Sequence, residues 1–84
     1  MNFPHSDVQS MEASGAVTSV RGSVVDVCFD AHLPSIFTVL RTGPKRQIVI
    51  EVLAQLDAHH IRGIALTPTQ GLARGMAVKT PAGP

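Results

Sequence analysis

Two carboxylates, Asp26 and Glu51, lie inside otherwise apolar stretches of the sequence and are the first residues that could do chemistry. If their strands are neighbours, the two could form a carboxylate pair in which each group shifts the pKa of the other. An unpaired carboxylate among apolar side chains costs free energy, so each needs a partner. We favour the alternative in which each pairs with an arginine or a backbone donor, and Arg62 and Arg74 are the natural arginine candidates.

The histidines and the single cysteine are not expected to form a metal site. His59 and His60 are adjacent, and neighbouring residues on a strand point to opposite faces, so they cannot hold one ion together. His32 lies close to Asp30, but two residues are too few ligands, and we expect His32 and His59 to be solvated. Cys28 has no cysteine to pair with, and its apolar surroundings favour a small buried hydrophobe over a reactive thiol.

Two glycines, Gly71 and Gly75, are four residues apart, but no Lys-Ser or Lys-Thr pair follows them, so no phosphate loop is expected. They are better explained as turn residues. Nothing in the sequence places a serine beside a histidine and an acid, so no nucleophilic triad can be argued. The residues alone therefore predict a domain without catalytic, cofactor-binding or metal-binding residues, whose role is contact.

Composition limits the partners of this chain. Its 84 residues suffice for one small domain, with seven Lys and Arg against six Asp and Glu, and a net charge of +1. There is no basic run and there are only three aromatic residues, which argues against nucleic-acid binding. No signal peptide and no apolar run of about 20 residues occurs, so we expect an intracellular protein without direct membrane insertion. Apolar residues make up 44% and charged residues only 15%, which favours a surface that a partner covers.

The elements that must position these residues are organised around residues 22–29, GSVVDVCF. β-Branched and apolar residues in a run this short are typical of a strand. Val25, Val27 and Phe29 share one face, and Asp26 lies on the other. Both faces are largely apolar, so we expect neighbours to cover both sides of this strand.

The rest of the chain predicts further short strands joined by turns that glycine and proline mark. Gly22 is expected to close a hairpin or to bend one long strand. A bulge at Gly63 would bring both Ile61 and Ile64 into the core. We expect strands at residues 15–20, 22–29, 36–40, 47–53, 60–66 and 76–80, with a turn at 41–45.

With no helix expected, the prediction is an all-β fold, a small closed barrel of six strands, because closure removes exposed strand edges. The barrel domain is assigned to residues 15–80. Residues 1–14 are expected to be a flexible arm, and residues 81–84 a linker.

Five segments resemble, in order and in spacing, the beginning of the beta subunit of F-type ATP synthases. They are VRGSVVDVCF at 20–29, LPSI at 33–36, IEV at 50–52 followed by QL at 55–56, IRGIAL at 61–66, and TQGLARG at 69–75. Each segment alone is a weak signal, whereas five in the right order are a strong one. The resemblance covers residues 15–80.

The sequence departs from the family pattern at two places. Asp57 stands where the family has a glycine after a turn, and Thr80-Pro81 replaces a threonine-glycine pair. Together with the unusual turn at residues 41–46, these departures suggest a divergent or second-copy bacterial form.

The resemblance implies the N-terminal barrel of the subunit, which in this family forms a ring of alternating alpha and beta barrels that holds the hexamer together. It implies alpha-subunit barrels as partners, and ATP or ADP with Mg in a following domain that is absent from this chain. The parent complex would make or hydrolyse ATP coupled to proton or sodium transport, as a peripheral complex on the cytoplasmic side of the bacterial inner membrane. No catalytic residue can be carried over to this chain.

Two alternatives remain open: the equivalent barrel of a related rotary or export ATPase, and a free-standing small β-barrel that binds RNA or a small ligand. The structural or interface candidates are Asp26, Glu51, Arg62, Arg74, Gly22, Gly63, Gly71 and Gly75.

Overall fold

The central hairpin forms where hydrophobic alternation is clearest. In the computed structural model, which describes residues 14–80, β1 (Ser14–Arg21) and β2 (Val24–Phe29) pair in antiparallel fashion. Gly22, in the turn between them, has a φ of 58°, which a glycine adopts without strain. The inward face of β2 is fully buried, as the alternation predicted. The outward face of β2 is the outside of the barrel, where Val24 is 40% exposed, so the expected cover of this second face does not come from residues 14–80.

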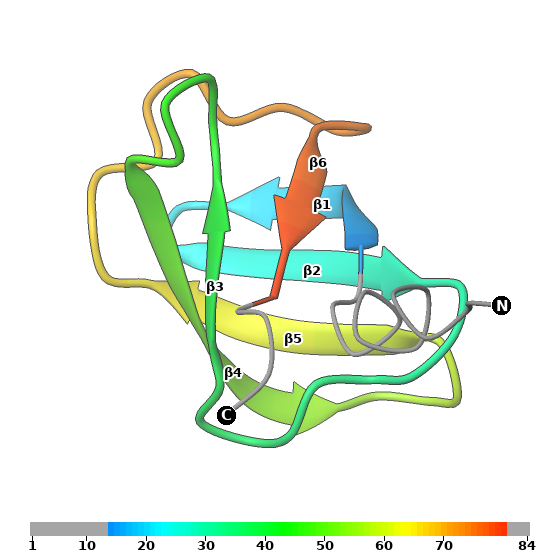
Figure 1. The fold of residues 1–84 in the computed structure, drawn as a ribbon. Helices are drawn as coiled ribbons and strands as arrows, with labels where there is room; N and C mark the ends of the chain where they lie inside the picture. Colours follow the sequence, from blue (N-terminus) through cyan, green and yellow to red (C-terminus); the bar gives the residue numbers. More distant parts are fainter. Residues whose placement is uncertain (1–13, 81–84) are drawn as a thin grey trace, which may run out of the picture.

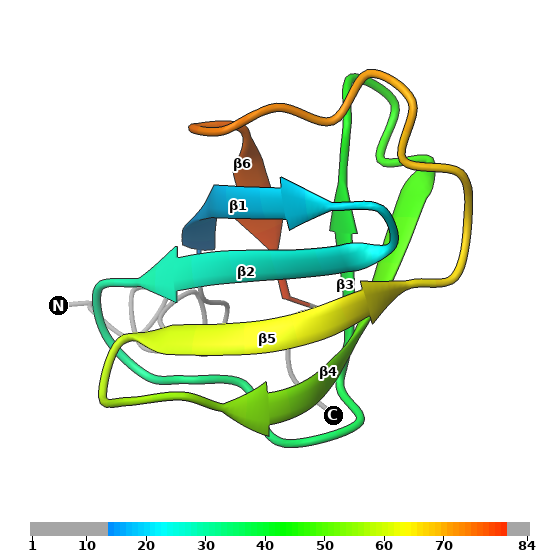
Figure 2. The same cartoon turned by 180° about the vertical axis from the view of Figure 1, so that it is seen from behind.

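Four more strands complete a closed antiparallel barrel, so the predicted fold class is confirmed (Figure 1). They are β3 (Val39–Thr42), β4 (Ile48–Gln55), β5 (His60–Ala65) and β6 (Ala77–Lys79). The strand order around the barrel is β1-β2-β5-β4-β3-β6, and Figure 2 shows the first four of these side by side. The structure describes no helix between residues 14 and 80 that could span a membrane. The predicted linker, and the predicted arm up to residue 13, lie outside the described residues, and Ser14 begins β1.

Every strand contributes inward-facing side chains to one apolar core, because alternate residues of a closed sheet point to its interior. Leu33, Leu72 and Met76, from the loops, pack against this core. The buried apolar side chains of residues 14–80 are Val17, Val25, Val27, Phe29, Leu40, Ile48, Ile50, Val52, Ile61 and Val78.

The third strand differs from its prediction at both ends. It begins at Val39 rather than Ile36, and it continues to Thr42, into the predicted turn. Ile36 and Phe37 instead form a turn that the bond from Thr38 N to Ser35 O closes at 3.1 Å. This turn lets Phe37 N donate to Val52 O, which leads the chain onto the edge of β4.

The bulge predicted at Gly63 was wrong in position. The extra residue of the β4–β5 pairing is Leu53, on the partner strand, between the pairs Val52↔Gly63 and Ala54↔Arg62. Gly63 faces inward, and an added Cβ would lie 2.6 Å from Ile50 Cγ2. Because Gly63 occupies the inward position, Ile64 points outward and is only half-buried.

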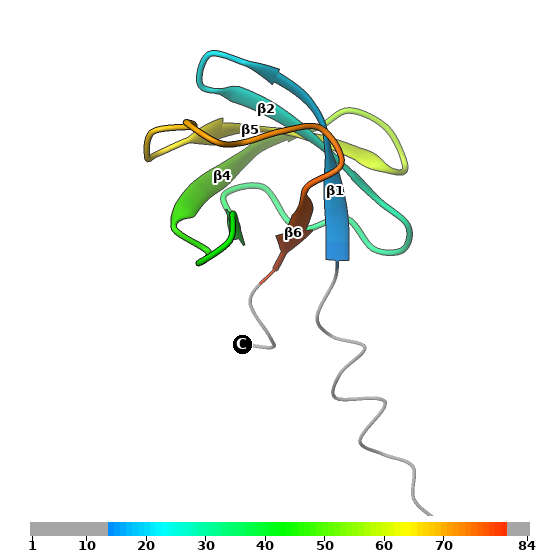
Figure 3. The same ribbon diagram turned by 90° about the horizontal axis from the view of Figure 1, so that it is seen from above.

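The shortest seam of the barrel joins β3 to β6 through two residue pairs, Arg41↔Lys79 and Thr42↔Val78. On its other side β6 pairs with β1, and Figure 3 shows these two strands next to each other. A buried side-chain hydrogen bond strengthens the seam, since Thr42 Oγ1 donates to Ala77 O at 2.6 Å.

Replacing Thr42 by valine is expected to lower the free energy of unfolding by about 1–2 kcal/mol, because the Ala77 carbonyl loses the hydrogen bond from the hydroxyl of the buried Thr42. Urea denaturation of the chain measures this change. Thr69→Val is the matched control, since Thr69 Oγ1 makes only an exposed bond of 3.4 Å to Gly22 O, and a change within about 0.5 kcal/mol is expected. An equal loss of unfolding free energy in Thr42→Val and Thr69→Val would contradict a stabilising hydrogen bond from Thr42 to Ala77.

Candidate functional site

An ion pair on the outside of the barrel joins Asp26 of β2 to Arg62 of β5. The two residues are directly opposite in the register of these antiparallel strands. Arg62 donates from Nε to Asp26 Oδ1 at 2.9 Å and from Nη2 to Oδ2 at 3.0 Å, a bidentate geometry. The hydrogen bond from Arg62, and then the charges of Arg62 and Arg21, hold the pKa of Asp26 below its ordinary value of 3.8 against the opposing effect of burial.

An open pocket of about 280 Å³ surrounds this ion pair. Ser19, Arg21 and Val24 complete its lining. Asp26 and Arg62 neutralise one another, so Arg21 leaves the lining with a net positive charge. The lining contains the Ser19 hydroxyl but no histidine.

The lowered pKa of Asp26 predicts that the free energy of unfolding decreases at acidic pH. The Asp26 carboxylate binds a proton less readily in the folded state than in the unfolded state. Its contribution to the free energy of unfolding is therefore fully present above pH 3.8 and is lost as pH falls through the lowered pKa. Urea midpoints measured between pH 2 and pH 6 are expected to fall less steeply below about pH 4 in Asp26→Asn than in the unchanged chain. The pKa of Asp57 is also lowered, so part of the pH dependence of the urea midpoint remains in both the variant and the unchanged chain. Identical pH profiles would contradict a stabilising ion pair.

The histidines and Asp57 organise the turn between β4 and β5. Asp57 Oδ1 accepts hydrogen bonds from the backbone N–H groups of His59 and His60, both at 2.8 Å. These bonds, His59 first, together with His60 Nδ1 at 2.9 Å, lower the pKa of Asp57. His59 is exposed, and its Nδ1 lies 3.1 Å from Phe29 O. These groups are engaged with their own backbone, and residues 14–80 hold no cluster of three potential metal ligands.

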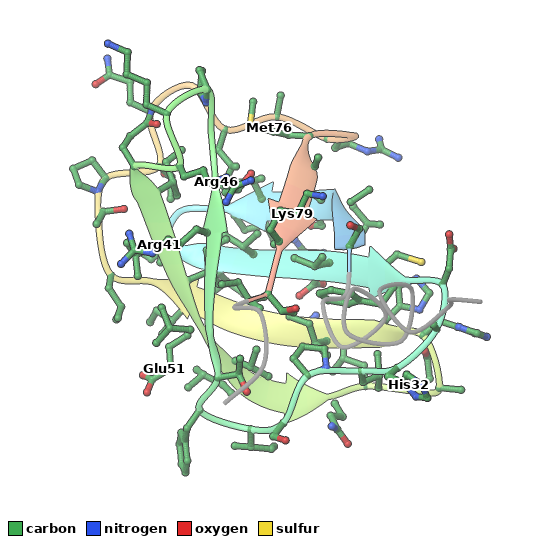
Figure 4. The ribbon with its side chains drawn as sticks, viewed as in Figure 1. His32, Arg41, Arg46, Glu51, Met76 and Lys79 are labelled. Atoms are coloured by element: carbon green, nitrogen blue, oxygen red, sulfur yellow. The ribbon has the colours of Figure 1, made fainter. Side chains whose placement is uncertain are left out.

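The other candidate residues are dispersed over the barrel. Glu51 lies on the outward face of β4, and β5 separates it from Asp26, so the structure does not bring the two carboxylates together. Arg74 is exposed in the connection before β6 and does not contact Asp26. Figure 4 shows Glu51 midway along β4. Cys28 is half-buried on the outward face of β2, not in the core.

Comparison with known proteins identifies this arrangement. The family model described as ATP synthase alpha/beta family, beta-barrel domain, matches residues 17–80. The chain belongs to this family. The resemblance found in the sequence motifs is thereby confirmed.

The similar relatives of this ATP synthase barrel are beta subunits. The protein named ATP synthase subunit beta 2 of Polaromonas naphthalenivorans is 69% identical over 70 residues, which is 83% of this chain and 15% of the relative. ATP synthase subunit beta 1 of Chlorobaculum tepidum is 55% identical over 73 residues, which is 87% of this chain and 15% of the relative. The chain thus spans about 15% of the length of these relatives.

The outer surface of the ATP synthase barrel carries several large apolar side chains. Phe37 is the most exposed, at 69%, and its backbone has a φ of 73°, which is strained for a bulky residue. Sequence reasoning missed this feature, because it placed Phe37 inside a strand. The other exposed large apolar residues are Val24, Ile36, Val39, Leu53, Leu56 and Leu66.

The candidate glycines of the ATP synthase barrel have two different roles. Gly22, Gly71 and Gly75 have positive φ, and a Cβ at any of them would meet open space. Gly63 is limited by its neighbours and not by its φ. The first three therefore serve turns, and the fourth serves packing.

Proposed function

We propose that this barrel holds an alternating ring of alpha and beta subunits together by contacting the barrels on either side of it. The observation that carries the proposal is membership of the ATP synthase alpha/beta family by a barrel that leaves large apolar side chains on its outside. Exposed apolar surface on a small domain is typical of protein contacts. A closed ring of this kind needs two different patches on each barrel, one for each neighbour.

The chain itself is proposed to be non-catalytic, with ATP or ADP and Mg bound elsewhere in the subunit. This is supported by the use of its polar groups: Asp26 is bound to Arg62, and Asp57 is bound to the backbone of its own turn. The parent complex is proposed to make or hydrolyse ATP coupled to proton or sodium transport, at the cytoplasmic side of a bacterial inner membrane. The names of the relatives, ATP synthase subunit beta 1 and 2, support this wider proposal.

The proposal is tested by mixing this chain with the alpha subunit of the same complex and following sedimentation velocity. A heavier species containing both proteins is expected. The Phe29→Ala variant, which removes a fully buried core side chain, is the negative control. Absence of the mixed species, or saturable binding of ATP by this chain alone in calorimetry, would overturn the proposal.

A further inference from the structure

Two like charges face one another across the shortest seam of the barrel. Arg41 of β3 and Lys79 of β6 are paired in the register. Their neighbours in the next pair, Thr42 and Val78, are buried in the interior, so Arg41 and Lys79 point outward. Side chains at such opposite positions start about 4.5–5.5 Å apart at Cβ, and like charges there are destabilising.

No carboxylate lies directly opposite either cation on the flanking strands, although Glu51 is the next outward residue after Val49 on β4. Arg41 is opposite Val49 on β4, and Lys79 is opposite Ser14 on β1. Across four adjacent strands the outward row therefore reads Val49, Arg41, Lys79, Ser14. Two cations lie at its centre, and within residues 14–80 neither forms an ion pair with Glu51.

The turn between β3 and β4 adds further positive charge. Lys45 and Arg46 lie in it, and the bond from Arg46 N to Gly43 O at 3.0 Å closes it. Figure 4 shows Arg46 and Lys79 beside β3 and β6, the Arg41 side chain extending toward β4, and Glu51 midway along β4. We call Arg41, Lys45, Arg46 and Lys79 the basic seam. Within residues 14–80 none of the four forms an ion pair.

Elsewhere in the barrel, a charged residue has a partner of opposite charge directly across the strand pair. Asp26 and Arg62 are also directly opposite, and they form a bidentate ion pair. The basic seam holds four of the seven Lys and Arg of the chain, and the one described carboxylate on the adjacent strand β4 is Glu51.

We propose that the basic seam receives carboxylates from a neighbouring subunit of the ring, an inference that rests on the proposed assembly function. Carboxylates placed between Arg41 and Lys79 would replace a repulsion with two attractions. Arginine suits this role because its guanidinium can bind a carboxylate in bidentate fashion. The seam is therefore one of the two patches that a ring requires, and its partner is an acidic surface.

Reversing one charge of the basic seam distinguishes a role in binding the partner subunit from a role in the stability of the barrel. Arg41→Glu places opposite charges across the seam, so the urea midpoint of the isolated chain is expected to stay the same or to rise. Association with the alpha subunit is expected to weaken at least tenfold, because the glutamate would face the partner's carboxylates. Arg74→Glu is the matched control, since it makes the same charge change at an exposed position outside the seam, and association is expected to change less than threefold.

Carbodiimide cross-linking provides an independent test, because the chain has only two lysines, Lys45 and Lys79, and both belong to the basic seam. The reagent joins a lysine Nζ to a carboxylate in contact with it as an amide and takes up the released water as its urea. Mass spectrometry of the complex is expected to find Lys79 or Lys45 joined to an Asp or Glu of the alpha subunit. Lys79→Arg keeps the charge and is expected to remove the Lys79 product while association persists.

The outcomes distinguish this inference from the proposed function. If the unchanged chain fails to join the alpha subunit, the assembly function falls, and the inference falls with it. If it joins, but Arg41→Glu and Arg74→Glu weaken association equally or neither does, the inference alone is overturned. Cross-links that involve no seam lysine would also overturn it.

Discussion

Replacing Gly63 by valine is expected to unfold the isolated chain. A Cβ at this position would lie 2.6 Å from Ile50 Cγ2 and 2.7 Å from the Glu51 carbonyl oxygen, and the second of these is backbone that cannot turn aside. Overpacking of this kind costs about 3 kcal/mol or more. A single core of this size rarely supplies more than about 3–5 kcal/mol, so little stability would remain. Urea denaturation monitored by circular dichroism measures the loss.

Gly71→Ala is the control for Gly63→Val. Gly71 has a φ of 89°, but a Cβ there would meet nothing within 4 Å, so only the backbone strain of about 1 kcal/mol is expected. A Gly63→Val variant as stable as Gly71→Ala would show that β4 can move away from β5, and the packing argument would then be wrong.

Truncating Phe29 to alanine is the second change with a large expected effect. Phe29 is fully buried in the core. Losing such a side chain costs about 3–5 kcal/mol, from the lost burial and the cavity left behind. At this size the loss is comparable to the whole stability of the barrel, so the Phe29→Ala chain is expected to be largely unfolded at 25 °C in a thermal melt.

Phe37→Ala makes the same chemical change on the outside of the barrel. Phe37 is 69% exposed, and alanine would meet the same positive φ, so stability is expected to change by no more than about 0.5 kcal/mol. Equal losses from Phe29→Ala and Phe37→Ala would contradict the burial on which the core assignment depends.

The strands could be predicted where alternation was uninterrupted. The inward set of β2 followed directly from the period of two, and β4 was recognised in the same way. The prediction failed between Ile36 and Thr38, because a run of β-branched and aromatic residues is also compatible with a turn. There the chain adopts a positive φ at Phe37, a conformation that a phenylalanine rarely takes.

The bulge was misplaced for a related reason. The slip in alternation near Gly63 was a real signal of irregular pairing, but a pairing involves two strands. The sequence of β5 alone cannot say which of them holds the extra residue, and the structure places it at Leu53 of β4.

The candidate site was also predicted only in part from the sequence. The sequence identified Asp26 as a carboxylate in need of a partner and offered both Arg62 and Arg74. The choice of Arg62 depends on the register between β2 and β5, which joins residues 36 positions apart. The basic seam was missed altogether, because Arg41 and Lys79 are far apart in the chain and become neighbours only when the barrel closes.

The sequence by itself determined the fold class, the inward face of the central strands and the family, since each is written in local alternation or in ordered short motifs. The tertiary structure alone decided which charges meet, which strand carries the bulge and which face of the barrel is left positive. Those features depend on the register between distant strands, and that register is set by the packing of the whole closed core and not by any one segment.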